Sequence, residues 1–204
     1  MIRSWVANHM MEALETSIHA FLYRNGCYPS ESFRQHSRFD SLYYMCDIQE
    51  VHDYVSHVTE SLRNPLVSDA IKSVNLCLFH KEQLESNFEF EFPLDFCREV
   101  TKTYATTITS EADLASIMHP FIKDILLSIY KHPQFNSKDY TSWRIVVETK
   151  DTSEELPVEE ILLVSKEAQD LFNEFHQISI KYPLTSHSLS PYQMSCISTN
   201  LANR

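Results

Sequence analysis

The residues that could do chemistry in this chain are first its cysteines and histidines, and neither set has the spacing of a known type of site. Five cysteines are present without any Cys-x-x-Cys pair: Cys27, Cys46, Cys77, Cys97 and Cys196. Disulfide frameworks and cysteine-ligated zinc sites need paired spacings, so we expect free buried thiols. The ten histidines are scattered and form no His-Glu-x-x-His motif. The sequence therefore predicts no metal site and no cofactor.

Catalytic groups are equally hard to assemble. Glu89 and Glu91 are regularly spaced carboxylates, but they alternate with phenylalanines, which is typical of a half-exposed strand rather than of a general acid–base pair. The chain has one glycine, Gly26, whereas phosphate-binding loops and nucleophile elbows need several. We therefore predict that the protein is not an enzyme. A hydrolase with a Cys–His or acid–base pair is the alternative, because such partners need not be neighbours in sequence.

The charge of the chain restricts its partners. The net charge is −11, and an acidic surface repels phosphates, so we expect no strong direct binding of nucleic acid. A basic partner surface fits better. Charged residues interrupt the N-terminal segment, and nowhere do about 18 apolar residues follow one another. We expect no secretory signal, no membrane association and a soluble intracellular protein.

Three helices are predicted from apolar residues that recur every three or four positions, over about residues 3–25, 47–63 and 111–131. Gly26 is expected to cap the first helix in a left-handed conformation, and Pro29 prevents its continuation.

Local signals mark the starts of the other two helices. Asp47 with Glu50, and Ser110 with Asp113, have the spacing of a capping box. Pro120 interrupts the third helix and removes a hydrogen bond, so a kink or a fresh helix start is expected there.

Strands are predicted at residues 71–79, 84–92 and 140–149, where apolar and polar residues alternate. The first two should form an antiparallel hairpin with one face on the core and the other in water. Residues 33–46 are interpreted as irregular or as a short hairpin, and residues 93–110 as a threonine-rich connection.

The last third of the chain is predicted to hold short, weak elements. Asp151 to Glu160 is interpreted as an exposed acidic linker. A strand at residues 161–164, a helix-like run at 165–176 and strands at 178–182 and 192–198 are expected to follow. Elements of this length are not stable alone, so they must attach to the earlier sheet. The fold class is α+β, with three helices on a mainly antiparallel sheet, an arrangement that can capture peptides by strand addition.

The segment Phe21–Phe33 resembles the end of the first helix in HORMA-domain proteins. That family has an aliphatic-Leu-Tyr segment, then Tyr-Pro, then a phenylalanine, and Tyr28-Pro29 and Phe33 match this pattern. The element order matches as well. The resemblance implies one HORMA domain over residues 1–204, with a core at about 3–150 and a C-terminal "safety belt" at about 151–204.

Within the family, three segments resemble the accessory, non-catalytic subunit of DNA polymerase zeta: Arg3–Val6, Met45–Tyr54 and Tyr182–Ser186. The resemblance implies an adaptor that traps a proline-containing peptide of the polymerase zeta catalytic subunit. It would support translesion DNA synthesis and DNA-damage tolerance, in the nucleus and also in the cytoplasm. Further implied partners are a second translesion polymerase and another HORMA protomer. The wording of residues 28–33 is equally close to the spindle-checkpoint member, so an adaptor of the spindle checkpoint or of the meiotic chromosome axis is the alternative.

The resemblance also implies site residues. Tyr54 matches the helix tyrosine that contacts the bound peptide, and the alternative is a rim tyrosine that closes the core. Ile180 and Tyr182 match belt positions that contact the peptide.

Two further positions follow from the same comparison. Lys123 matches a basic residue used for HORMA–HORMA dimerisation, and an ordinary solvated lysine is the alternative. The belt tryptophan of the polymerase subunit has no clear match, and Leu171 or Phe172 is the nearest substitute. The stretch around Gly26 is expected to be structural rather than a site.

Overall fold

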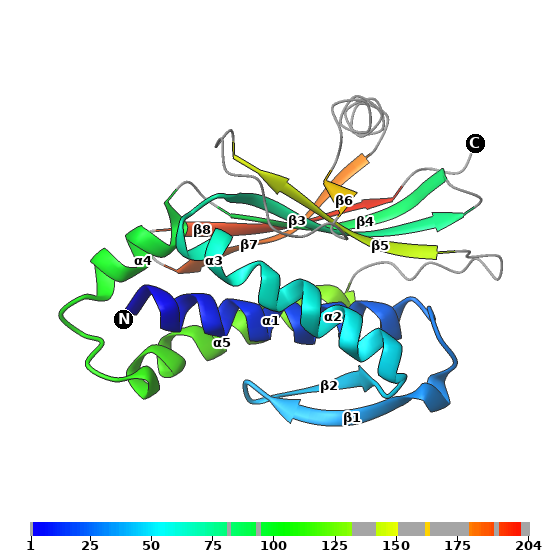
Figure 1. Ribbon diagram of the computed structural model, residues 1–204, viewed down its shortest axis with the longest axis horizontal. Coiled ribbons are helices and arrows are strands. Elements are labelled where there is room, and N and C mark those ends of the chain that lie inside the picture. The colour runs from blue at the N-terminus through cyan, green and yellow to red at the C-terminus, as the bar shows by residue number, and fades with distance from the viewer. Residues whose placement is uncertain are drawn as a thin grey trace.

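The computed structural model describes residues 2–80, 83–92, 95–131, 142–150, 162–163, 180–189 and 192–200. Figure 1 shows a helical layer between a large sheet and a small two-stranded one. The helical layer consists of α1 (Ile2–Arg24), α2 (Gln49–Ser61), α3 (Arg63–Val67), α4 (Phe96–Tyr104) and α5 (Glu111–Lys131). The small sheet pairs β1 (Phe33–Arg38) with β2 (Ser41–Cys46). The large sheet contains β3 (Ile71–His80), β4 (Gln83–Glu91), β5 (Ser142–Thr149), β6 (Leu162–Leu163), β7 (Ile180–Leu189) and β8 (Tyr192–Asn200).

Helix α1 runs through the centre of the molecule, between the two sheets. Its buried residues lie on all sides of the helix, and even His19 is fully buried. The predicted cap at its end is confirmed. Gly26 has a φ of 63°, the N–H of Cys27 bonds to the carbonyl of Leu22, and the N–H of Gly26 bonds to the carbonyl of Tyr23. These two bonds form a Schellman motif, which satisfies the last carbonyls of the helix.

Residues 33–46 form a hairpin, which decides between the two interpretations of this segment. The turn is made by Phe39 and Asp40, with φ of 53° and 52°, the left-handed pair that a two-residue hairpin needs. Phe39 is buried and lies edge-on to the ring of His119 on α5, with centroids 5.1 Å apart. The packing of Phe39 thus compensates for an unfavourable backbone conformation.

Helix α2 has the predicted apolar stripe, since Val51, Val55 and Val58 are buried, but the predicted capping box at Asp47 is wrong. The residue before the first turn is Ile48, without a side-chain cap. Asp47 instead forms an ion pair with Arg34 of β1, so its carboxylate is directed to the hairpin.

Two predicted helix boundaries differ in the structure, both at prolines. Helix α3 includes Pro65, where the helix was expected to end. Proline is tolerated there because the amides of a first turn lack helical partners anyway. Helix α5 continues through Pro120 without a new start. Pro120 and Ser116, whose carbonyl loses a donor, are both exposed, so water can satisfy that carbonyl.

The start of α5 has the predicted capping box. The N–H of Asp113 bonds to Ser110 Oγ at 3.2 Å, and the N–H of Ser110 bonds to Asp113 Oδ2 at 2.8 Å. Hydrogen bonds from Thr109 and then from Ser110 lower the pKa of Asp113 to about 2.

The prediction of a threonine-rich connection at residues 93–110 is wrong, because α4 occupies the middle of this segment. Phe96, Cys97 and Val100 are spaced as one face of a helix and are buried. The N–H of Cys97 also bonds to Asp69 Oδ1 at 2.8 Å. The threonines of this segment are exposed or half-buried, and they hid its helical pattern.

The large sheet has the strand order β6-β5-β3-β4-β8-β7, and the predicted antiparallel core β5-β3-β4 is confirmed. Its inner face packs on the helices through residues such as Phe88 and Phe90. Its outer face was expected to meet water, and this is wrong at its centre, where Asn75 and Asn87 are buried. Asn87 donates to Asn75, and Asn75 donates to Ser73, both at 2.9 Å.

The C-terminal strands extend the sheet on both sides. Strand β6 pairs in parallel with Val146 and Val147 of β5, and β8 pairs with β4. Strand β7 continues through Pro183 with an irregular register, although Pro183 was expected to end it. The predicted acidic linker and the helix-like run at residues 165–176 lie outside the described residues.

Candidate functional site

Tyr54 lies on α2 and faces Trp143 at the start of β5. Its ring meets the indole of Trp143 edge-on, with centroids 5.5 Å apart and planes at 68°. Both side chains are half-buried and pack against the main core. Tyr54 therefore borders the buried stripe of α2, as the sequence predicted, and its packing agrees with the rim position given as the alternative.

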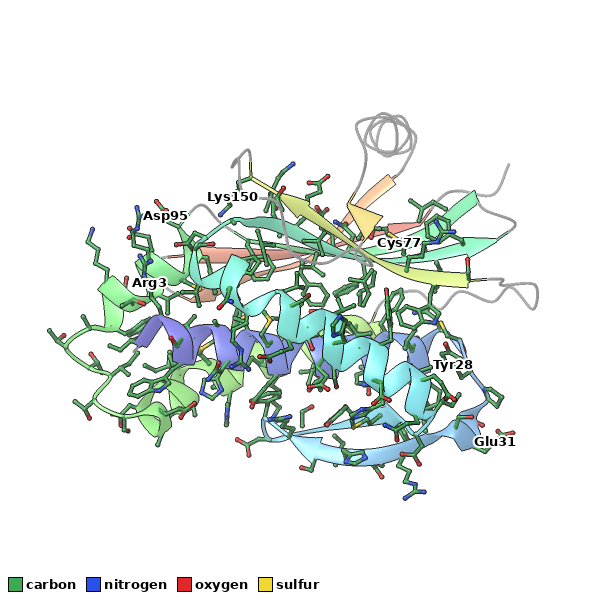
Figure 2. The ribbon with its side chains drawn as sticks, viewed as in Figure 1. Arg3, Tyr28, Glu31, Cys77, Asp95 and Lys150 are labelled. Carbon is green, nitrogen blue, oxygen red and sulfur yellow. The ribbon has the colours of Figure 1, made fainter. Side chains whose placement is uncertain are left out.

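Trp143 also contacts the loop that follows α1. Its indole Nε1 donates a hydrogen bond of 2.9 Å to the hydroxyl of Tyr28, which Figure 2 labels at the end of the molecule where α1 stops. Burial raises the pKa of Tyr28, so its hydroxyl stays protonated at neutral pH and retains a proton to donate. We call Tyr28, Tyr54 and Trp143 the aromatic cluster. It joins three segments that are distant in sequence.

A small pocket adjoins the aromatic cluster at Tyr28. It has a volume of about 330 Å³ and is lined by the residues Tyr23, Arg24, Gly26, Tyr28, Ser30 and Tyr130. One wall is fixed by a stack of Tyr23 on Tyr44, with centroids 3.8 Å apart. Aromatic rings with polar tips present both apolar area and hydrogen-bonding groups.

The cluster stands at the beginning of a sheet edge that is partly open. Strand β5 pairs along its length with β3 on one side. On the other side, among the described strands, only Val146 and Val147 have a partner, in β6. Within the described part of the chain, the backbone groups of residues 142–145 on this edge therefore have no strand partner, as an added strand would require.

The predicted belt residues lie elsewhere. Ile180 and Tyr182 are on β7, where they pair with Asn200 and Ser198 of β8. Strands β3, β4 and β8 stand between β7 and β5, so the sheet places these residues about 19 Å from β5. The structure does not bring them next to Tyr54, and their role stays a prediction.

Lys123 is exposed on α5. Leu127, one turn further along the same helix, is also exposed, with 41% of its surface accessible. The role of Lys123 in dimerisation stays a prediction too.

The buried titratable groups are held in unreactive forms. Burial raises the pKa of the Cys97 thiol to about 12 and raises that of Cys77 as well, and Figure 2 shows Cys77 within the sheet. Burial lowers the pKa of His19 to about 4. These thiols are therefore protonated and this imidazole is neutral at pH 7, a poor state for nucleophilic or acid chemistry.

The described residues hold no candidate metal site and no helix suited to crossing a membrane. No group of three His, Cys, Asp or Glu side chains there could hold a metal ion. None of the helices there is long and apolar enough to cross a membrane.

Sequence reasoning singled out Tyr54, whose role in binding stays a prediction, but it missed Trp143 and the contact role of Tyr28. Trp143 lies in a predicted strand and shares the face of Ile145 and Val147, which are buried against the helices. That alternation was a signal that the indole faces α2. The loop around Gly26 was expected to be structural only, yet Tyr28 belongs to the aromatic cluster.

No family model matches this sequence and no curated protein matches it, but solved structures share its fold. A chain of the mitotic checkpoint complex superposes with a TM-score of 0.67 at 17% identity, covering 97% of this chain and 99% of that one. Caenorhabditis elegans HTP-2 bound to the HIM-3 closure motif gives 0.63 at 7% identity, with coverages of 97% and 91%. C. elegans HTP-1 bound to HTP-3 motif-1 gives 0.62 at 10%, with 96% and 90%. These neighbours are HORMA-domain proteins, and the predicted HORMA-like α+β fold is confirmed.

Proposed function

We propose that this chain is a non-catalytic adaptor that binds an extended segment of a partner protein at the open edge of β5. The observation that carries the proposal is the position of the aromatic cluster, since Trp143 lies at the start of β5, whose outer edge has no partner strand at residues 142–145 among the described residues. An added strand would pair its backbone with this edge. One of its side chains would then lie near Tyr54 and Trp143.

The chemistry of the cluster suits a proline or another apolar side chain. The rings of Tyr54 and Trp143 offer apolar faces and are half-buried, so they lose little conformational freedom when a partner covers them. The HORMA fold of the neighbours supports the same reading, because the HTP-1 and HTP-2 structures are bound to closure motifs.

For the identity of the partner, we propose a proline-containing peptide of the polymerase zeta catalytic subunit. The support is the resemblance of Arg3–Val6, Met45–Tyr54 and Tyr182–Ser186 to the accessory subunit of that polymerase. The role would be translesion DNA synthesis in the nucleus. In this proposal residues 151–204 act as the belt that retains the peptide, and Ile180 and Tyr182 contribute to that retention.

An adaptor of the spindle checkpoint or of the meiotic chromosome axis is the second candidate. It is favoured by the likeness to the checkpoint-complex chain and to HTP-1 and HTP-2. Both candidates share the adaptor mechanism and differ only in the partner.

The decisive experiment is affinity purification of the full-length chain from its own cells, followed by mass spectrometry. Recovery of a B-family polymerase would support the first candidate, and recovery of a checkpoint activator or chromosome-axis protein would support the second. Recovered partners should be lost with Tyr54→Ala and retained with Tyr54→Phe. Partners that bind both variants equally would overturn the site. Turnover of a substrate that one Cys or His substitution abolishes would overturn the adaptor role.

A further inference from the structure

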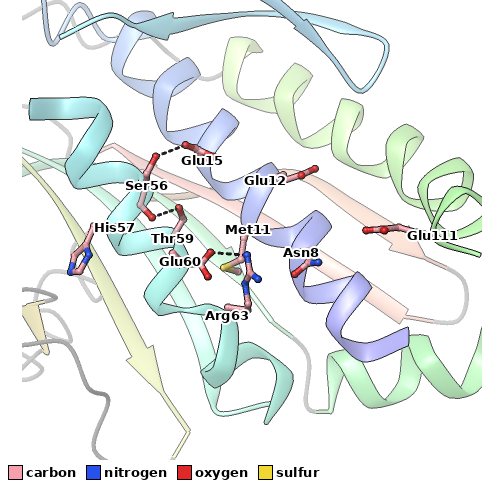
Figure 3. A pocket seen from close by; sticks show the side chains of 10 residues that line it. All are labelled: Asn8, Met11, Glu12, Glu15, Ser56, His57, Thr59, Glu60, Arg63 and Glu111. Carbon is pink, nitrogen blue, oxygen red and sulfur yellow. Dashed lines mark hydrogen bonds and ion pairs between the residues drawn. The ribbon is translucent and has the colours of Figure 1, made fainter. Parts of the chain in front are cut away.

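A groove lies between α1, α2 and the start of α5, apart from the aromatic cluster. This groove has a volume of about 560 Å³ (Figure 3). Two of its lining residues, Met11 and Thr59, are buried. Helix α1 supplies Glu12 and Glu15 to its walls.

The walls of this groove are dominated by carboxylates from three helices. Glu60 of α2 and Glu111 of α5 join the two glutamates of α1. Arg63 is the one permanently charged cation among the lining residues, and it is bonded to Glu60 at 2.7 Å. The lining therefore carries an excess of negative charge.

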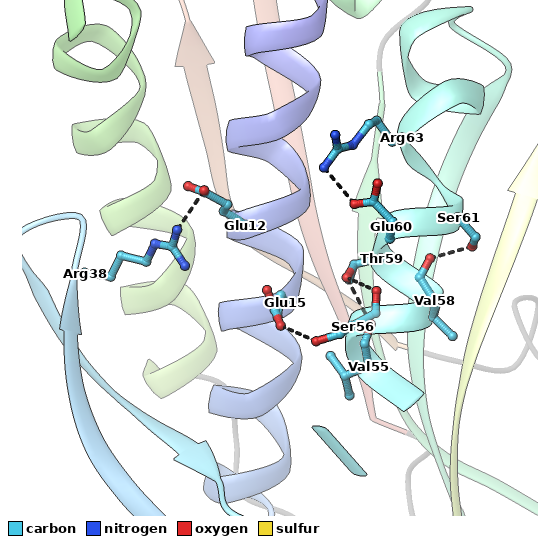
Figure 4. A network of polar contacts seen from close by, with 10 residues as sticks. All are labelled: Glu12, Glu15, Arg38, Val55, Ser56, Val58, Thr59, Glu60, Ser61 and Arg63. Atoms are coloured by element: carbon cyan, nitrogen blue, oxygen red, sulfur yellow. Dashed lines mark hydrogen bonds and ion pairs between the residues drawn. The ribbon is translucent and has the colours of Figure 1, made fainter. Parts of the chain in front are cut away.

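A hydrogen bond and two ion pairs hold Glu15, Glu12 and Glu60 in place (Figure 4). Ser56 Oγ donates to Glu15 at 2.7 Å, and Arg38 of β1 reaches Glu12 at 2.7 Å. The imidazole of His9, whose Nδ1 lies 3.7 Å from the carboxylate, and then the charge of Arg38 hold the pKa of Glu12 below its usual value. Glu12 is thus ionised at neutral pH and fixed at the wall.

An unused acceptor lies among the same residues. The amide oxygen of Asn8, which lines the groove, is buried and has no hydrogen-bond donor within the described part of the chain. A buried acceptor without a partner costs free energy, and a ligand that donates hydrogen bonds would relieve that cost. Ionised carboxylates likewise act only as hydrogen-bond acceptors, so a ligand of this groove should be rich in N–H donors.

The groove is separate from the aromatic cluster. Ser56 is two residues after Tyr54, about 200° further around the helix, and Glu60 falls on the same side as Ser56. A segment bound at Tyr54 and a ligand in the groove would therefore occupy opposite sides of α2 and could bind together.

We propose that this groove is an interaction surface for a basic segment of a partner protein, one with closely spaced lysine or arginine side chains. The positive groups would lie among Glu15, Glu60 and Glu111, and their N–H donors would reach the carboxylates and the Asn8 oxygen. The net charge of −11 would steer such a segment toward the protein. A metal ion is a poorer occupant, because no set of metal ligands is found in the described residues.

The test uses the full chain, a fluorescent peptide of alternating lysine and alanine, and the same peptide with acetylated lysines. The groove variant is Glu15→Gln with Glu60→Gln and Glu111→Gln. The matched control is Glu31→Gln with Glu50→Gln and Asp124→Asn, which removes as much charge at exposed sites outside the groove. The groove variant should weaken binding of the lysine peptide by about tenfold, from three partly exposed ion pairs. The control should change the affinity for the lysine peptide by less than about twofold, because charges outside the groove act only through a screened long-range attraction.

Equal losses in the two variants, or equal binding of the acetylated peptide, would overturn the proposal, since either result means diffuse attraction or no charge recognition. Thermal melting checks that both variants fold. Glu111→Lys, on the exposed first turn of α5, is the second variant and should alone weaken binding. A segment bound at Tyr54 should bind the groove variant unchanged, which separates this site from the proposed function. Dimerisation that the groove variant abolishes would assign the groove to a second copy and overturn a partner segment.

Discussion

Trp143 and Tyr28 are 115 residues apart in the chain and are joined by a hydrogen bond of 2.9 Å from the indole to the phenol. This bond ties the start of β5 to the loop after α1, and the same indole packs edge-on against Tyr54 of α2. The surroundings of Tyr54 thus depend on the hydrogen bond between Trp143 and Tyr28. The sequence pattern of α2 carries no information on that contact.

A double-mutant cycle measures how much the hydrogen bond between Trp143 and Tyr28 contributes to stability. Trp143→Phe keeps an aromatic ring and removes the N–H, and Tyr28→Phe removes the acceptor. Urea unfolding should give a coupling free energy of about 1 kcal/mol between the two changes, the usual net value of one hydrogen bond. Trp143→Phe paired with Tyr104→Phe, at the end of α4, is the control and should be additive. Additivity of the first pair would contradict the bond.

The contribution of Tyr54 to partner binding is tested by truncating it. Tyr54→Ala should weaken binding of a captured partner segment by about 1–3 kcal/mol, as for an aromatic anchor at an interface. Tyr54→Phe keeps the ring that meets Trp143 and should bind nearly as well. Isothermal titration calorimetry gives both affinities. An unchanged affinity for Tyr54→Ala would show that this residue does not contribute to binding.

The C-terminal segment is tested by removing it. A chain that ends at Thr149 lacks β6, which pairs with β5, and β8, which pairs with β4. It also lacks β7, which pairs with β8. If residues after 150 retain the partner segment, this shortened chain should lose it in a pull-down. Circular dichroism shows whether the shortened chain keeps its helices, and a folded short chain that still binds would refute retention by the belt.

Much of the fold could be predicted because local patterns and tertiary packing agree. The stripe of Val51, Val55 and Val58 is periodic in sequence and buried in the structure. The failures occur where tertiary contacts decide. Helix α4 lies in a threonine-rich segment and is stabilised by the burial of Phe96 and Cys97. Asp47 forms an ion pair with Arg34 instead of capping its helix.

The candidate site was only partly predictable for a related reason. A half-buried tyrosine on a helix rim follows from spacing, so the rim position of Tyr54 could be predicted. Its neighbours come from a loop and from another strand, and single-sequence periodicity carries no information on which distant residues meet. The hydrogen bond of Trp143 to Tyr28 is set by sheet topology and could not be read from either segment.

The single glycine gives a test of the cap of α1. A Cβ at Gly26 would meet no atom within 4 Å, so Gly26→Ala adds no clash. The φ of 63° is still unfavourable for alanine, and the free energy of unfolding should fall by about 1 kcal/mol. Gly26→Asn should cost less, because asparagine tolerates this conformation better. Urea unfolding compares the three proteins, and equal stabilities would show that the helix end rearranges.

The buried imidazole of His19 gives a pH dependence with a defined sign. Burial, then the neighbouring His52 and His36, lower the pKa of His19 to about 4. A histidine in the unfolded chain has a pKa of about 6.5. Because the pKa in the folded state is the lower one, protonation favours unfolding. The stabilisation is therefore complete above about pH 6.5 and is lost as the pH falls toward about 4, by about 3 kcal/mol in total.

Substitution of His19 isolates this term from other groups that titrate in acid. His19→Gln keeps an acceptor for the N–H of Cys46, which bonds to His19 Nδ1 at 3.3 Å, and removes the titration. The loss of unfolding free energy from neutral to acid pH should be smaller in this variant than in the unmodified protein. His57→Gln changes an exposed histidine and should keep the original slope. Parallel curves for His19→Gln and the unmodified protein would mean that His19 does not titrate between its two states.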